Sequence, residues 1–308
     1  MAIRTRSVIV ATLSLDTAFF IANFLVFYYG GSRAVLSQAL YTITDVIAGI
    51  MIYWGVKVSL EPPTHTHPFG RGKERFFWAF TAGLVTFSVA GFLVLVEGVL
   101  EIMNPGHLAD LTESLATVSA TLVASLISLF IVLEEIREQK ITVDTIMESE
   151  HQEIKMILVQ DIVSMMGAAV ALTGIFLVYE TGNVLYDGLA ASVVGALLVG
   201  TGFVFAMDAR EFLVGKGVSA EEGKTILSIV ERYPFVRQVQ GMQSMLMGPD
   251  EVLVGLRVNF VNELTTDDVE MHIDQLRRFV TGEFPRIKHM LIEPVAETQM
   301  KKVDKQGQ

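Results

Sequence analysis

The sequence contains no cysteine among its 308 residues. This absence excludes disulfide bonds and thiolate metal sites, and it leaves the redox compartment undetermined. Charge is also scarce, because Asp, Glu, Lys and Arg make up 19% of the chain, whereas apolar residues make up 51%. The mean hydropathy is +0.49. A chain this apolar differs from an ordinary globular protein, and its composition indicates several membrane spans.

The sequence also lacks a basic face and a catalytic constellation. Residues 1–208 hold nineteen acidic and ten basic residues, so the acid excess lies in the apolar part of the chain. Nothing in this distribution resembles a nucleic-acid surface, and we expect no nucleic-acid partner. No set of nucleophile, general base and orienting residue is evident in the sequence, and no glycine-rich phosphate-binding loop occurs. We therefore expect that the protein is not an enzyme.

Six apolar runs are long enough to cross a bilayer, which takes about twenty residues. The first run contains Asp16 and Asn23 and lacks a small-residue cleavage site, so we interpret it as a span and not as a signal peptide. The six predicted spans are 8–30, 36–60, 77–103, 111–135, 156–180 and 185–208.

Lys and Arg occur in alternate loops, and so lie on one side of these predicted spans. Basic residues precede the first span and fill the loops after the second and fourth spans, whereas the opposite loops hold only Arg33. Because basic loops face the cytoplasm, we expect cytoplasmic N- and C-termini. No targeting segment is evident, which favours a prokaryotic inner (plasma) membrane.

From about residue 212 the pattern becomes that of a soluble domain. Two capped helical patterns and three strand patterns follow in the order αββαβ, with the turn "GPDE" between the first two strands. We predict a cytoplasmic ferredoxin-like domain over 212–298, with both helices on one face of the sheet. The fold class is thus an α-helical membrane protein, with a six-helix transport domain over 1–211 and a disordered polar tail over 299–308.

Two aspartates lie inside predicted spans, Asp45 in the second and Asp161 in the fifth. A charge near the bilayer centre costs about 2.5–3.5 kcal/mol, so each marks a candidate functional site. Tyr41 precedes Asp45 by one helical turn and shares its face. A divalent cation held between the two carboxylates would satisfy both. From residue types alone, protonation or a structural bond to a neighbouring helix explains them equally well.

Several motifs together resemble the cation diffusion facilitator family. They are the six spans with cytoplasmic termini, the loop "HTHPFGRGKERFFWAF", the exit "NPGHL" after the third span, and a terminal αββαβ domain that ends "LIEPV". The resemblance implies an exporter of zinc or a related divalent metal, driven by proton exchange and assembled as a homodimer in the lipid bilayer. It implies no cofactor beyond the transported ion.

The resemblance also implies a metal site between the second and fifth spans. Asp45 and Asp161 match two acidic ligand positions, while Tyr41 and Ile157 stand where the family often has His or Asp, and Gln160 stands where a related branch has Glu. The expected site residues are therefore Asp45, Asp161, Tyr41 and Gln160. We expect Tyr41 to orient Asp45 by a hydrogen bond. Gln160 either adds its amide oxygen or, pointing about 100° around the helix, misses the ion. An oxygen-only site makes Mn²⁺ or Fe²⁺ candidates beside Zn²⁺.

The expected function is export of a divalent metal by alternating access coupled to protonation of these carboxylates. The alternatives are a transport-incompetent relative that acts as a metal sensor or scaffold, and a channel or carrier for an organic solute. His65 and His67, in the loop after the second span, are interpreted as structural. The terminal domain contains only His272 and His289, and we expect no binuclear metal centre there.

Overall fold

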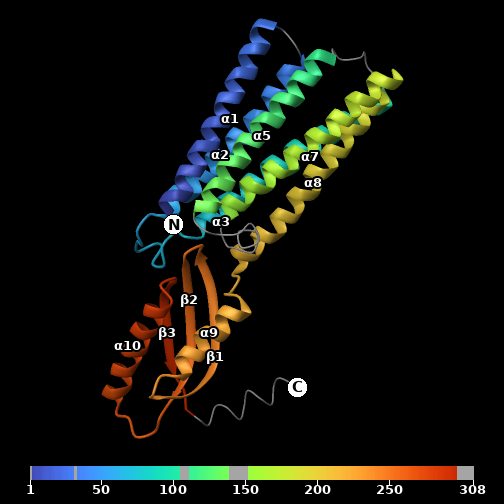
Figure 1. Cartoon of the computed structure of the whole chain (residues 1–308). Helices are drawn as coiled ribbons and strands as arrows, with labels where there is room; N and C mark the ends of the chain where they lie inside the picture. The colour runs from blue at the N-terminus through green and yellow to red at the C-terminus, as the bar shows by residue number, and fades with distance from the viewer. Residues whose placement is uncertain (1, 31–32, 105–110, 139–151, 297–308) are drawn as a thin grey trace, which may run out of the picture. The chain divides into compact units, whose positions relative to one another are not determined.

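The computed structural model describes residues 2–30, 33–104, 111–138 and 152–296. The chain forms two compact units, one of Met1–Leu60 with Glu74–Arg210 and one of Glu61–Lys73 with Glu211–Gln308 (Figure 1). The loop after the second span thus belongs to the C-terminal unit and not to the helical one. The predicted tail, 299–308, lies outside the described residues.

The helical unit contains the predicted spans. Among the described residues, six helical stretches are long and apolar enough to cross a membrane, which confirms the predicted number. The third stretch is continuous but changes from an α-helix to a π-helical segment and back. In order, the elements are α1 (Ala2–Gly30), α2 (Arg33–Ser59), α3 (Glu74–Gly83), η1 (Leu84–Ala90), α4 (Gly91–Met103), α5 (Leu111–Glu138), α7 (Gln152–Thr181) and α8 (Leu185–Val214).

Helices α1 and α2 pack against each other along their length, and α5 packs against both α1 and α7 (Figure 1). The Arg6 guanidinium donates a 2.6 Å hydrogen bond to the Tyr53 hydroxyl, which fixes one end of the α1–α2 pair. Apolar side chains from all these helices meet in one buried cluster, including Ile9, Val56 and Met156. These residues lie near the start of α1 and of α7 and toward the end of α2 and of α5, so the packing brings these four helix ends together.

The third and sixth spans meet through glycines. A Cβ placed on Gly98 would lie 2.5 Å from the backbone nitrogen of Ser192, and one on Gly91 would lie 2.7 Å from Leu198 Cβ. The backbones of α4 and α8 therefore approach as closely as glycine allows. In lipid, where helices gain little from the hydrophobic effect, such close van der Waals packing drives association.

Aromatic side chains lie near the ends of the spans. Tyr28 and Tyr29 are exposed at the end of α1, and Trp54 is exposed near the opposite end of the bundle, with the Lys57 ammonium 5.3 Å from the centre of its ring. Tyr and Trp favour the two membrane interfaces because their rings are apolar and their polar atoms remain hydrated. Their positions agree with helices that cross the bilayer.

The C-terminal unit has the predicted order αββαβ. It consists of α9 (Ala220–Glu231), β1 (Val236–Gly248), β2 (Glu251–Phe260), α10 (Thr266–Glu283) and β3 (Ile287–Pro294). The sheet order is β1-β2-β3, with β2 antiparallel to β1 and parallel to β3. Both helices begin at a side-chain cap, Ser219 for α9 and Thr265 for α10. These caps are the signals from which the sequence predicted the two helices.

The core of this unit lies between the sheet and its two helices. Helix α9 packs on β1, and α10 packs on β3 and on α9, so both helices cover the same face, as predicted. Alternate residues of β2 are fully buried on that face, namely Val252, Val254, Leu256 and Val258. His272 of α10 is buried as well and stacks on Phe235, with 3.6 Å between the ring centres.

Candidate metal site between the spans

Asp45 and Gln160 join the second and fifth spans. Asp45 lies near the middle of α2, and Gln160 lies in the first third of α7. The Gln160 amide nitrogen Nε2 donates a 2.9 Å hydrogen bond to Asp45 Oδ1. Two of the four predicted site residues, 115 positions apart in the sequence, are therefore in direct contact.

Asp161 lies next to Gln160 but in a more enclosed position. The residue is 6% exposed, and among the described residues its Oδ2 atom has no hydrogen-bond partner. Ser128 of α5, itself buried, is within hydrogen-bonding reach of the same carboxylate. A buried carboxylate oxygen without a donor is unfavourable. This atom is consequently the strongest sign of a place for a cation.

Three acidic side chains act on one another in this part of the bundle. The Asp16 and Asp161 carboxyl groups both repel that of Asp45 electrostatically, and the Asp16 carboxyl group also repels that of Asp161. Asp16 comes from α1, a helix to which the sequence analysis gave no site residue. The only sequence signal for it was an acid near the middle of an apolar run, the same signal that identified Asp45 and Asp161.

The arrangement is open and not a closed metal cage. Within the part of the chain that the structure describes, no three His, Cys, Asp or Glu side chains converge closely enough to hold a metal ion. Asp45 is already bonded to a neutral amide, and the expected role of Gln160 as an oxygen ligand stays a prediction, since its nitrogen faces Asp45 here. A bound ion would require the amide to turn or to withdraw.

The two departures from the family pattern fall on Tyr41 and Ile157. Tyr41 lies in α2 one turn before Asp45, but its side chain is outside the described side chains, so its expected hydrogen bond to Asp45 stays a prediction. Ile157 is buried in the apolar cluster of the bundle. An isoleucine in that environment offers no ligand.

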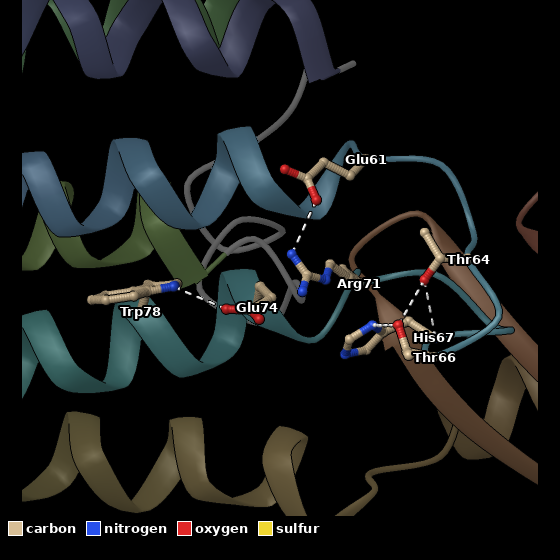
Figure 2. A network of polar contacts seen from close by, with 7 residues as sticks. All are labelled: Glu61, Thr64, Thr66, His67, Arg71, Glu74 and Trp78. Atoms are coloured by element: carbon tan, nitrogen blue, oxygen red, sulfur yellow. Dashed lines mark hydrogen bonds and ion pairs between the residues drawn. The ribbon is translucent and has the colours of Figure 1, made fainter.

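His67, in the loop after the second span, has hydrogen-bond partners within its own unit. In the loop after α2, the His67 backbone N–H donates to Thr64 Oγ1 at 3.2 Å, and His67 Nδ1 lies 3.1 Å from Thr66 Oγ1 (Figure 2). The same loop carries a 3.0 Å ion pair between Arg71 and Glu61. These contacts agree with a structural role for His67, because they fold the loop back on itself.

Comparisons with known proteins were made for the whole chain. The human mitochondrial proton-coupled zinc antiporter SLC30A9 is 24% identical over 272 residues, which are 85% of this chain and 48% of that protein. The cation-efflux pump FieF of Klebsiella pneumoniae (strain 342) is 24% identical over 281 residues, covering 91% of this chain and 89% of the pump. Metal tolerance protein C4 of Arabidopsis thaliana is 20% identical over 258 residues, covering 80% and 56%. The chain thus spans about half the length of the SLC30A9 proteins it matches.

A family model also matches the chain. The model describes the cation efflux transmembrane domain and matches residues 9–214, from the first turns of α1 to the last residue of α8. This match covers all six membrane-spanning stretches and more than half of the sequence. The chain therefore belongs to the cation efflux family, the cation diffusion facilitators, and is an integral membrane protein.

Proposed function

We propose that the protein exports a divalent metal cation from the cytoplasm in exchange for protons, and that Asp45 and Asp161 bind the ion. The observation that carries this proposal is the junction of α2 and α7, where Gln160 contacts Asp45 beside a buried Asp161 oxygen that has no hydrogen-bond partner among the described residues. Family membership supports the transport of a cation. The name of one relative, a proton-coupled zinc antiporter, supports the exchange for protons.

Proton coupling follows from the chemistry of the two carboxylates. A carboxylate binds a metal ion only when it is deprotonated, so metal and proton compete for the same oxygens and metal binding releases protons. In the arrangement described, the Gln160 N–H occupies Asp45 Oδ1, and a neutral amide is a weaker partner than a divalent cation. An arriving ion would displace the amide, and protonation on the opposite side of the membrane would release the ion.

The transported ion is proposed to be Zn²⁺, Mn²⁺ or Fe²⁺. Zinc sites in proteins favour imidazole and thiolate, whereas carboxylate, carbonyl and water oxygens suit harder ions. The chain has no cysteine, and Tyr41 and Ile157 replace ligands that the family often supplies. Asp45, Asp161, the Gln160 amide oxygen and water would form a site of oxygen atoms only.

We propose cytoplasmic N- and C-termini and a homodimer in a plasma membrane. The orientation rests on the basic residues at the start of α1 and in the loop between α2 and α3. Crosslinking in native membranes would test the dimer, and protease protection in sealed vesicles would test the orientation.

The function is tested by flux in proteoliposomes with an imposed pH gradient. Uptake of Zn²⁺, Mn²⁺, Fe²⁺, Co²⁺ and Ni²⁺ is followed with a trapped metal indicator, and internal pH is followed in parallel. Asp45→Ala and Asp161→Ala should each abolish both signals. Asp187→Ala, which removes a carboxylate at the start of α8, is the matched control and should keep them.

The result that would overturn the proposal is the absence of metal-dependent proton movement for the folded native protein with all five ions. In that case the protein would be a metal sensor or scaffold, a role favoured by the absence of metal-binding side chains at Tyr41 and Ile157. Such a protein would still bind metal, and calorimetric titration of the purified chain would show this binding without flux.

A further inference from the structure

We propose that Asp16 of α1 is a third carboxylate of the transport site and binds the cargo ion together with Asp45 and Asp161. This inference rests on the proposed function, which it deepens by assigning a ligand to a helix outside the second and fifth spans. Four observations support it: the register of two helices, the charges around Asp45, a buried oxygen without a partner in the described residues, and the two ligand positions that lack a metal-binding side chain.

The register of the α1–α2 pair places Asp16 level with Asp45. Arg6 contacts Tyr53 near one end of the pair, and a Cβ on Gly49 would lie 2.9 Å from Leu13 Cδ1 near its middle. The two helices therefore run antiparallel, so that later residues of α1 lie beside earlier residues of α2. Asp16 follows Leu13 by three residues and Asp45 precedes Gly49 by four. Spacings of three and four keep a residue on the same helix face, so Asp16 and Asp45 both lie along the α1–α2 contact.

The charges agree with this placement. The charge of Asp16 acts on both Asp45 and Asp161, although the three residues come from three different helices. Helix α1 also packs on α5, which carries Ser128 within reach of the Asp161 carboxylate. Asp16 therefore belongs to the same layer of the bundle as the two predicted ligands.

A separate observation indicates that this layer accommodates a cation. Asp161 Oδ2 is buried, and no donor in the described part of the chain reaches it. Thr12, one turn before Asp16, cannot serve as that donor, because its hydroxyl bonds to the carbonyls of Val8 and Ile9 in its own helix. A divalent ion would give the Asp161 oxygen the positive partner that the described part of the chain does not supply.

Asp16 also compensates for what the site otherwise lacks. Tyr41 and Ile157 leave Asp45 and Asp161 as two carboxylates, whose combined charge of −2 is the minimum that neutralises a divalent ion. A third carboxylate adds a ligand and a charge, and it does so with the hard oxygen atoms that suit Mn²⁺ or Fe²⁺. In the described arrangement the three acids have not converged to metal-binding distance, and Gln160 holds Asp45 Oδ1. Loading would replace that amide and draw the three carboxylates together.

The test measures metal binding and flux in the purified full-length protein. Calorimetric titration with Mn²⁺ and with Zn²⁺ is performed on the native protein, on Asp16→Asn and on the control Asp187→Asn. We expect Asp16→Asn to weaken Mn²⁺ binding by at least about 10-fold, the lower end of the loss seen when supporting groups of metal sites are removed. Asp187→Asn should bind as the native protein does.

A relocation variant distinguishes a ligand from a group that acts only on packing. The double substitution Asp16→Asn with Tyr41→Asp moves a carboxylate from α1 to α2, one turn before Asp45. If Asp16 is a ligand, this double variant should recover at least a third of the native affinity for Mn²⁺. If it binds no better than Asp16→Asn, the proposal is overturned.

Two further outcomes keep the inference separate from the proposed function. Unchanged binding and flux in Asp16→Asn, with both lost in Asp45→Asn and Asp161→Asn, would refute the role of Asp16 and leave the transport function intact. If Asp45→Asn and Asp161→Asn both keep metal binding and flux, the transport site itself is refuted. Should Asp16→Asn fail to fold, Asp16→Glu retains the charge on a longer side chain. Its ratio of Mn²⁺ to Zn²⁺ affinity should then change at least threefold, and an unchanged ratio counts against the proposal.

Discussion

Replacing Gly195 with alanine should separate α8 from α4 and destabilise the helical unit. A Cβ at this position would lie 2.6 Å from Leu95 Cα and 2.8 Å from Leu95 Cβ. The first of these atoms belongs to the backbone of α4, so no change of rotamer relieves the contact. Non-bonded carbon atoms are most stable about 3.5–4.0 Å apart, and the two helices must therefore separate by about 1 Å.

The expected loss of stability is about 2–3 kcal/mol. A gap of 0.5–1 Å removes about a quarter to a half of the dispersion energy of a contact, and inserting an extra carbon into a packed region costs about 1–3 kcal/mol. We expect the upper part of that range because Gly98 and Gly91 lie in the same α4–α8 contact and would lose their close approach as well. Two helices in lipid depend on this packing more than two helices in water do.

Gly200→Ala is the matched control in the same helix. Nothing lies within 4 Å of a Cβ at Gly200, so this variant gains helix propensity without a clash. The difference between the two variants isolates packing from propensity. It is measured by reversible unfolding in mixed detergent micelles, followed by circular dichroism. If Gly195→Ala proves as stable as Gly200→Ala, the close approach of α4 and α8 is not the source of their association.

Four other predictions concern single contacts. Lys155→Met removes the ion pair between Lys155 of α7 and Asp208 of α8, whose side chains are 13% and 27% exposed. The free energy of unfolding should fall by about 1–3 kcal/mol in the same assay. Exchanging Lys155 and Asp208 should restore part of this loss. Thr265→Ala removes the capping box of α10 and should destabilise the C-terminal unit by about 1 kcal/mol in urea titrations. The Thr265 hydroxyl and backbone N–H lower the pKa of Asp268. The ionised Asp268 carboxylate therefore contributes to stability at neutral pH, and this contribution is lost as the pH falls through the lowered pKa. Asp268→Asn should flatten this part of the profile of stability against pH. Tyr41→His should raise the flux of Zn²⁺ relative to Mn²⁺ in proteoliposomes, because imidazole suits zinc, and an unchanged ratio would argue against a position for Tyr41 next to the ion.

The sequence predicted the fold because the bilayer leaves few choices. A run of about twenty apolar residues must form a helix to satisfy its backbone in lipid, so six runs gave six spans. The observed helices extend beyond the runs; α7, for example, begins at Gln152, although apolar residues begin at 156. Hydrogen bonding along the backbone continues into polar residues at the membrane surface, and hydropathy does not record this. In the C-terminal unit, caps and alternation marked each element, but the buried position of His272 depended on stacking with Phe235 and was not predicted.

The site was only partly predictable for a different reason. Asp45 and Asp161 stood out because any charge inside a span is costly. Asp16 gave the same signal, but the face of α1 that meets α2 depends on register, which the contacts of Leu13 and Gly49 reveal and the sequence does not. Gln160 was expected about 100° away from Asp161 on its helix. That angle is compatible with the contact observed, because Gln160 reaches Asp45 on another helix and not the carboxylate beside it.

The energetic cost of these acids argues that they are present for chemistry and not for the fold. On the lenient insertion scale each ionised carboxylate deep in the bilayer costs about 2.5–3.5 kcal/mol, so Asp16, Asp45 and Asp161 together would cost roughly 8–11 kcal/mol. A whole domain has a net stability of only about 5–15 kcal/mol. One amide hydrogen bond from Gln160, together with a serine hydroxyl near Asp161, offsets little of that amount. Apolar residues in the same places would pack without this penalty. This cost supports the proposal that three such groups in one layer share a positive ion, or protons, that enters and leaves.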